Sequence, residues 1–293
     1  MTRARLFCIP VLLGALFQGC SQNPANPDAP EQVLTGEAMG TTYRIKLAAG
    51  TDADAAHSAV KQTLAVLEQV LSNWRDDSWV TRFNRLHSTE PQPVPDIVWP
   101  LLEEALALCV ETEGRFDITV SPLVERWGFG AHPSRLPAPD EVEIRELLER
   151  CGYEKLKLDK ATHRLTKLNP ALELDFGAIT KGYAVDQIFT ALEKLGHERF
   201  LIEFGGHLRG RSGAPGAPAW RIAQPRNREP LLLSEGALAT SGPEHQRRGD
   251  ICHLIDPRSG RAISIQHSVT VSEPTCTRAD ALATAKAIEQ SRE

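Results

Sequence analysis

The order of helical and strand-like patterns is the feature that most limits what this chain can fold into. Apolar residues recur at helical spacing mainly in the earlier part, and strand-like segments gather later. The helices expected from this pattern cover about 52–71, 96–112, 139–150, 180–195 and a segment from about 277 onward. The expected strands cover about 41–47, 154–158, 163–168, 171–175, 199–204, 219–223, 230–233, 251–255 and 267–272. Because helices and strands do not alternate regularly, an α+β fold with mixed sheets and helices packed on them is favoured over a doubly wound sheet.

The first 19 residues are not expected to belong to this fold. Two arginines precede an apolar run, Leu6–Phe17, which is too short to span a bilayer. Small residues then lead to Cys20, a pattern typical of a bacterial lipoprotein signal peptide whose cysteine carries the lipid. Simple secretion, with Cys20 an incidental residue, is the alternative. We expect an exported protein that is anchored through Cys20 at the periplasmic face of a bacterial membrane.

The rest of the chain divides into a tether and a folded body. Residues 20–32 are polar and proline-rich, which is typical of a disordered tether. Residues 33–293 are enough for one large domain or two lobes around a substantial core, and the glycine- and proline-rich run 205–218 is the expected surface loop or lobe boundary. Removing the signal peptide takes away two arginines and changes the formal charge from −5 to −7. An acidic body without basic runs argues against a nucleic-acid surface.

The cysteines give little support to a metal site. Four remain after Cys20, and none lies at a spacing typical of metal ligands. Export makes a disulfide permissible, but the sequence does not define a pairing. Cys109 lies on the apolar face of an expected helix, so we expect a small core residue there.

The segment Asp175–Asp186, with sequence DFGAITKGYAVD, combines a tight turn with the start of a helix. Gly177 lets the chain turn, and Thr180 can cap the helix that follows. Such a helix start presents N–H groups and a positive dipole end to an anion. Lys181 and Gly182 both weaken an isolated helix, unless a negative ligand meets Lys181 and another group approaches Gly182 closely. The segment fits a phosphate-binding turn and, equally, an ordinary turn before a helix with a solvated lysine.

Asp280 and Thr284 form a second candidate pair. On a helix they lie four residues apart and project side by side. A carboxylate and a hydroxyl suit Mg²⁺, which completes its shell with water and ligand phosphates. An aspartate near a helix N-terminus also serves as a cap or dipole partner, so the pair alone leaves both roles open.

His253 and several aromatic residues are the remaining candidates. His253 precedes a DPRSG turn on an expected strand with Ile255, where it can act as a base towards a hydroxyl nucleophile or simply hold the turn. Aromatic residues stand beside glycines in 114–119 and 127–130, and Trp74 follows two small polar residues. Aromatics against exposed backbone suit a flat ring system, although each is commonly a core residue.

Nine motifs in this order resemble the ApbE family of flavin transferases, over about residues 36–286. The motifs are MGTTY (39–43), SNWRDDSWVTRFN (72–84), GRFDITVSPLVERWGFG (114–130), LDFGAITKGYAVD (174–186), FGG (204–206), ALATSG (237–242), HLIDPRSG (253–260), SVTV (268–271) and ADALAT (279–284). The resemblance implies a two-lobed single unit with the FAD site between the lobes.

The resemblance also implies an activity. FMN would be transferred from FAD to a threonine hydroxyl of a target protein through a phosphoester bond, with release of AMP and a requirement for Mg²⁺. The residues at positions where such proteins contact FAD are Met39, Trp74, Arg115, Phe116, Asp117, Asp175, Lys181 and Ile255. The implied Mg²⁺ ligands are Asp280, Thr284 and the backbone carbonyl of Ala178, and His253 matches a histidine that assists the nucleophile. The alternative functions are an FAD pyrophosphatase, which gives FMN and AMP, and a non-catalytic FAD-binding lipoprotein.

Three positions depart from the family pattern. Trp74 stands where the family commonly has tyrosine, and a larger aromatic keeps stacking on a ring feasible. His207 follows two glycines where the family usually has an acidic or amide residue. After ADALAT the chain continues as AKAIEQSRE in place of the family's apolar stretch and further elements, so its C-terminal end looks shortened.

Overall fold

A computed structural model describes residues 31–223, 229–243 and 246–291. The expected signal peptide, Cys20 and nearly all of the expected tether lie outside the described residues. Gln32, the last tether residue, already belongs to a strand. No helix in the described part of the chain is long and apolar enough to cross a membrane.

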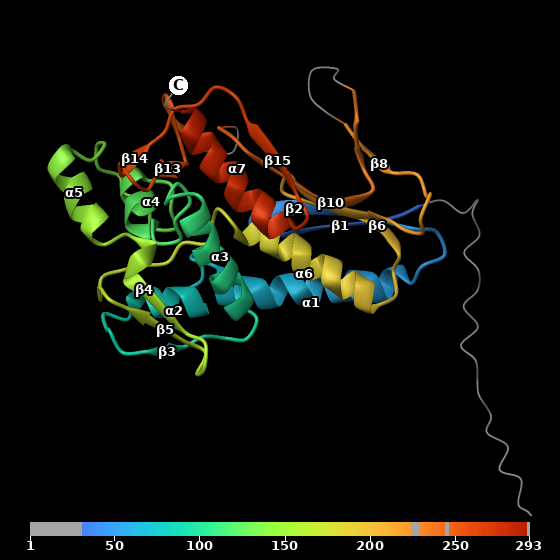
Figure 1. Cartoon of the computed structure of the whole chain (residues 1–293), viewed down its shortest axis with the longest axis horizontal. Coiled ribbons are helices and arrows are strands. Elements are labelled where there is room, and N and C mark those ends of the chain that lie inside the picture. Colours follow the sequence, from blue (N-terminus) through green and yellow to red (C-terminus); the bar gives the residue numbers. More distant parts are fainter. Residues whose placement is uncertain (1–30, 224–228, 244–245, 292–293) are drawn as a thin grey trace, which may run out of the picture.

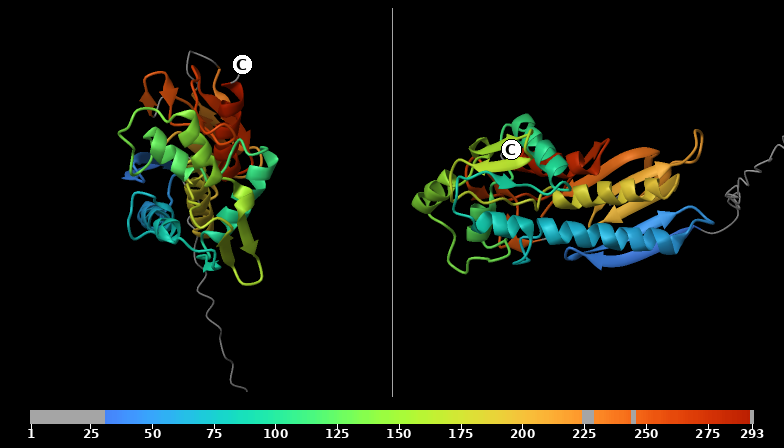
Figure 2. Two further views of the ribbon diagram at one scale, coloured as in Figure 1. Left: turned by 90° about the vertical axis from the view of Figure 1, so that its left-hand side faces the viewer. Right: turned by 90° about the horizontal axis from the view of Figure 1, so that it is seen from below.

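The larger lobe is built on a six-stranded antiparallel sheet (Figures 1 and 2). Its strands, in order across the sheet, are β1 (Gln32–Ala38), β2 (Thr41–Leu47), β6 (Arg199–Phe204), β7 (His207–Ser212), β10 (Glu235–Ser241) and β15 (Val269–Glu273). Along β2, Tyr43, Ile45 and Leu47 are buried and alternate with more exposed residues. This alternation turns one face of the sheet towards the core.

Three long helices cover that face. They are α1 (Ala53–Leu71), α6 (Thr180–Lys194) and α7 (Cys276–Gln290). Helices α6 and α7 pack against each other and against the sheet, and α1 lies along α6 (Figures 1 and 2). The Asp52 carboxylate caps α1 by accepting the Ala55 N–H at 3.0 Å. The apolar positions that predicted α1 are all buried, so its periodicity reports the core-facing side correctly.

The second lobe contains shorter elements, at the left in Figure 1. Its helices are α2 (Trp79–Arg85), α3 (Trp99–Glu111), α4 (Ser121–Trp127) and α5 (Glu141–Glu149), and a 3₁₀ turn covers Tyr153–Lys155. A three-stranded sheet joins β3 (Gln92–Pro93), β5 (Arg164–Lys167) and β4 (Leu156–Asp159). The remaining strand pairs are β8 (Trp220–Ile222) with β9 (Leu231–Leu233), β11 (Arg247–Arg248) with β12 (Ile251–Cys252), and β13 (Ile255–Asp256) with β14 (Arg261–Ala262). One hydrophobic core runs through both lobes, since Ile45, Leu102 and Leu165 belong to the same buried cluster.

The α+β class is confirmed, but the structure differs from the predictions for 205–218 and 171–175. Residues 207–212 are not a surface loop but β7, inside the six-stranded sheet. The sequence of β7, HLRGRS, lacks a clear strand pattern because a glycine occupies a crowded position. A Cβ on Gly210 would lie 2.9 Å from the Leu201 side chain. The segment 171–175 forms no strand ladder. Its apolar residues are buried against the core, and a side chain, Asn84, holds its backbone instead.

All four cysteines that follow Cys20 are buried free thiols, and Cys109 is a core residue as predicted. Burial raises the pKa of the Cys151 thiol to about 12, so this thiol stays protonated near neutral pH. No disulfide among the described residues therefore supports the predicted export.

Candidate active site

One cavity of about 810 Å³ collects the twelve residues singled out from the sequence. The residues are Met39, Trp74, Arg115, Phe116, Asp117, Asp175, Ala178, Lys181, His253, Ile255, Asp280 and Thr284. They come from both lobes, and many of them are far apart in the sequence. Its volume lies within the roughly 300–1,000 Å³ of small-molecule and cofactor pockets. The cavity therefore has the size and the mixed lining that a nucleotide-like ligand requires.

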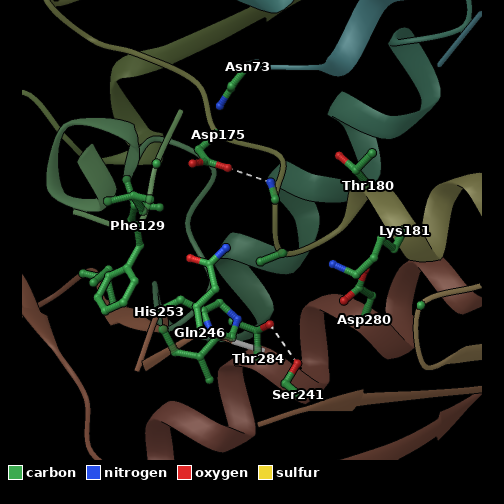
Figure 3. A pocket seen from close by; sticks show the side chains of 18 of the residues that line it. Asn73, Phe129, Asp175, Thr180, Lys181, Ser241, Gln246, His253, Asp280 and Thr284 are labelled. Atoms are coloured by element: carbon green, nitrogen blue, oxygen red, sulfur yellow. Dashed lines mark hydrogen bonds between the residues drawn. The ribbon is translucent and has the colours of Figure 1, made fainter. Parts of the chain in front are cut away.

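Asp280 lies where α6 and α7 cross, on the side of the cavity that also carries Lys181 (Figure 3). Its Oδ2 accepts the backbone N–H of Gly182 at 2.9 Å, and its Oδ1 lies 2.8 Å from His207 Nε2. Burial alone would raise the pKa of Asp280, but His207, Lys181 and the Gly182 N–H together lower it below its ordinary value. A carboxylate is thus kept ionised although only 3% of the residue is exposed.

Gly182 is required by packing between the two helices. A Cβ at this position would overlap the Cys276 carbonyl and would lie 2.8 Å from the Asp280 Cβ. The close approach expected at Gly182 is therefore made by α7. Because Asp280 accepts the Gly182 N–H, that donor is not available to an anion.

The predicted helix cap is wrong by one residue. Ile179 is the N-cap of α6 and makes no side-chain capping bond, while Thr180 is already helical. The Thr180 hydroxyl donates to the Phe176 carbonyl at 2.7 Å. Asp280, which comes from another helix, supplies the carboxylate that the start of α6 lacks locally.

Asp186 fixes the start of α7 in the same manner. Its carboxylate accepts the N–H groups of Cys276 and Thr277 at 2.9 and 2.8 Å and the Thr277 hydroxyl at 2.5 Å. Arg209 also donates to it at 2.7 Å. Asp186 thereby holds the helix that carries Asp280 and Thr284. No local pattern signals this role, because Asp186 and its partners at the start of α7 are about 90 residues apart along the chain.

The turn at Asp175 is stabilised from two directions. Asp175 Oδ1 accepts the Gly177 N–H at 2.6 Å, and the Asp175 N–H donates to the Ile118 carbonyl at 2.7 Å. The Asn84 amide bonds both the N–H and the carbonyl of Leu174, at 2.7 and 2.8 Å. Burial raises the pKa of the half-buried Asp175 carboxyl, and the Gly177 N–H and Lys181 oppose that rise.

The expected cation ligands share one part of the cavity. Thr284 lies one turn after Asp280 on α7, as the spacing predicted, and its Oγ1 is 3.2 Å from Ser241 Oγ. Ala178, whose carbonyl is the third expected ligand, lines the same cavity. No cluster of three or more histidine, cysteine or carboxylate side chains with metal-binding geometry occurs in the described part of the chain. A cation here would therefore rely on hydroxyl and backbone oxygens as well, which is the donor set of a hard ion such as Mg²⁺.

The aromatic side of the cavity is more open. Trp74 is 70% exposed, whereas Phe116 and Phe129 are buried parts of the lining. Met39 lies in the two-residue turn between β1 and β2, where Met39 and Gly40 both have positive φ. An exposed indole in a cavity lining offers a surface on which a ring system can stack.

Arg115 and Asp117 line the cavity and bond to nearby loop residues, although Arg115 Nε has no hydrogen-bond partner among the described residues. The Asp117 carboxylate accepts bonds from Thr119 and from the Tyr153 N–H, at 2.7–3.0 Å. The Arg115 guanidinium donates to the Thr112 carbonyl at 3.1 Å and to Glu113 at 2.9 Å. Both residues hold the loops of the second lobe in place.

His253 lies on a bend between β12 and β13, so the single strand expected over 251–255 is interrupted there. Its N–H donates to the Gln246 carbonyl at 3.2 Å. Gln246 lies beside it, and Ser241 and Asn73 line other parts of the cavity (Figure 3); the sequence predicted no role for these three residues. Short polar side chains of this kind carry no distinctive pattern in a single sequence.

The family model described as ApbE family matches residues 39–293, so this chain belongs to the ApbE family. The resemblance inferred from the motifs is therefore confirmed. The FAD:protein FMN transferase of Salmonella typhimurium is 35% identical over 300 residues, which cover 94% of this chain and 84% of that protein. The FAD:protein FMN transferase of Vibrio cholerae is 36% identical over 291 residues, which cover 92% of this chain and 83% of that protein.

Solved structures agree with this assignment. Flavin transferase ApbE from Vibrio cholerae superposes with a TM-score of 0.79 at 33% identity, over 89% of this chain and 87% of that chain. The apo form of the flavinyl transferase ApbE from Pseudomonas stutzeri gives the same TM-score and identity, over 89% of this chain and 86% of that chain. The two-lobed architecture is thus shared with ApbE flavin transferases.

Proposed function

We propose that this protein transfers FMN from FAD to a threonine hydroxyl of an acceptor protein and releases AMP. One observation carries the proposal: every residue implied by the family motifs lines a single cavity of cofactor size. The similarity to FAD:protein FMN transferases over most of the chain supports the same activity.

The α6–α7 side of the cavity is suited to the FAD pyrophosphate. Lys181 and Asp280 point into the same region, and Thr284 lies one helical turn further along α7 (Figure 3). We assign Asp280, Thr284 and the Ala178 carbonyl as ligands of a divalent cation, with Mg²⁺ as the ion that the family resemblance implies. The cation would neutralise phosphate charge and make AMP a better leaving group. Lys181, on the same side of the cavity, would also bind the phosphates.

The reaction needs one proton acceptor. The threonine oxygen forms a bond to the FMN-side phosphorus, the anhydride bond between the two phosphates breaks, and AMP leaves. The hydroxyl proton passes to His253, whose imidazole lines the cavity. Positioning and electrostatic stabilisation supply most of the catalysis in phosphoryl-group transfer.

The function is tested by incubating the purified mature protein with FAD, Mg²⁺ and a threonine-bearing acceptor domain. We expect flavin fluorescence on the acceptor band in a denaturing gel and one AMP per flavin attached. An acceptor with alanine in place of the threonine is the matched control. AMP and free FMN without labelling would instead identify a pyrophosphatase, and unchanged FAD that remains bound would identify a binding protein.

We also propose that the protein is exported and anchored through a lipid on Cys20. The support is the sequence pattern of residues 1–20. Expression of the full chain in a bacterium supplied with a labelled fatty acid should label the protein in the membrane fraction. Cys20→Ala should remove the label, and a Cys20→Ala protein that keeps it would contradict the anchor.

A further inference from the structure

His207 is the residue of the cavity that departs most from the family pattern, and its surroundings are unusual. It is 2% exposed and lies at the start of β7, beside Asp280 of α7. Its Nε2 is 2.8 Å from Asp280 Oδ1, yet Nε2 has no aligned hydrogen-bond partner among the described residues. The two atoms are close without the geometry of a hydrogen bond.

The other ring nitrogen fixes the orientation of the imidazole. His207 Nδ1 lies 3.1 Å from the Gly205 carbonyl oxygen, which can only accept, so Nδ1 carries the proton. Nε2 is therefore the ring nitrogen that faces the Asp280 carboxylate. Buried at 2.8 Å from Oδ1 and without an aligned partner among the described residues, Nε2 is placed to share a cation with Asp280.

A metal ion fits this arrangement better than a proton does. A proton on Nε2 would not point along the line to Asp280 Oδ1, because the pair lacks hydrogen-bond alignment. Adjacent ligands of an octahedral cation with bonds of about 2.1 Å lie roughly 3 Å apart, close to the observed separation of Nε2 and Oδ1. A ligating histidine also commonly donates its second ring N–H to a backbone carbonyl, as His207 does to Gly205.

We propose that His207 Nε2 is a further ligand of the divalent cation and makes this site select a first-row transition-metal ion over Mg²⁺. The proposal rests on the cation site assigned to Asp280, Thr284 and Ala178 under the proposed function. Mg²⁺ favours oxygen donors, whereas imidazole favours later divalent ions such as Co²⁺ and Zn²⁺. An acidic or amide residue at position 207 would keep the donor set entirely oxygen-based.

The test is cation binding alone, without FAD or acceptor, to the purified mature protein. Co²⁺ affinity is measured by equilibrium dialysis and by its visible absorption, and Mg²⁺ affinity by competition against Co²⁺. In His207→Asn we expect Co²⁺ affinity to fall at least about tenfold, while Mg²⁺ affinity stays within about threefold because an amide oxygen still suits Mg²⁺. The change in the Co²⁺ to Mg²⁺ affinity ratio is the decisive quantity.

Two other results would overturn the inference. Equal losses for both ions would make His207 a positioning residue that acts through Asp280, and no loss for either would remove it from the site. If His207→Asn fails to fold by circular dichroism, His207→Gln is measured in its place against the same criteria. Asp280→Asn tests the cation site separately from His207. Retained cation binding in that variant would contradict the cation site itself. Lost cation binding would leave only the role of His207 in question.

Discussion

The two sides of the cavity are built differently. The α6–α7 side, which we define as Lys181, Gly182, His207, Asp280 and Thr284, is held by hydrogen bonds and close helix packing within the protein. The aromatic side, which we define as Asn73, Trp74, Phe116 and Phe129, includes an indole that is 70% exposed. Figure 3 shows Phe129 and Asp280 on different sides of the cavity.

This difference indicates a division of tasks. Groups that stabilise charge must be in place before the reaction, because reorganising them during the reaction costs free energy. An exposed aromatic surface instead gains packing when a ring covers it. We therefore expect changes on the α6–α7 side to act on turnover and changes on the aromatic side to act on FAD affinity.

The largest expected effect comes from Asp280→Ala, which removes the only carboxylate expected to ligate the cation. Turnover should fall at least about 10³-fold, while much of the FAD affinity should survive through aromatic and backbone contacts. Time-course transfer assays measure turnover, and FAD titration measures FAD affinity. Lys286→Ala, an exposed change on the same helix, is the control. Undiminished turnover in Asp280→Ala would contradict the cation assignment.

His253→Ala tests whether chemistry also depends on a group outside the α6–α7 side. Removing a general base should slow transfer by about 10²-fold or more, and FAD should still bind. The rate of acceptor labelling at saturating FAD and the dissociation constant of FAD report these two effects separately. Loss of FAD binding together with turnover would make the role of His253 structural.

Gly182→Ala tests whether the crossing of α6 and α7 is as tight as the structure indicates. The added methyl group would overlap the Cys276 carbonyl, which belongs to the backbone and cannot easily move. Overpacking should lower the free energy of unfolding by about 1–3 kcal/mol, despite the better helix propensity of alanine. Chemical denaturation measures the change, with Gln187→Ala on the same helix as the control. A more stable Gly182→Ala protein would show that the helices have room to separate.

The smallest effect is expected from Trp74→Ala on the aromatic side. An aromatic stacking contact contributes about 0.5–1.5 kcal/mol beyond area burial, so FAD affinity should fall roughly tenfold once the lost burial is added. Trp74→Tyr, the residue common in the family, should restore most of the affinity. Unchanged affinity in Trp74→Ala would exclude Trp74 from the FAD contacts.

Much of the fold could be predicted because it follows local periodicity. The apolar spacing of α1 and the pair Asp280 and Thr284 on α7 depend on residues that are near in sequence. Strand β7 was missed because a sheet tolerates glycine and arginine where neighbouring strands supply the packing, and those neighbours are not visible in the local sequence.

The candidate site shows the same limit more sharply. Family motifs identify its lining residues, but the contacts that fix them join distant segments: Asp186 to the start of α7, Asn84 to Leu174, and Asp280 to Gly182. Within its own helix, Gly182 only lowers helix propensity. The residue is required because the backbone of α7 approaches it closely. Such reasons emerge only from tertiary packing.

The most direct test of the division of tasks is the single-turnover rate of flavin transfer at saturating FAD, measured for Asp280→Ala and Trp74→Ala side by side. Saturation removes differences in FAD affinity, so the rate reports the reaction alone. We predict a loss of at least about 10³-fold in Asp280→Ala and of less than about tenfold in Trp74→Ala. Equal losses in the two variants would contradict the account.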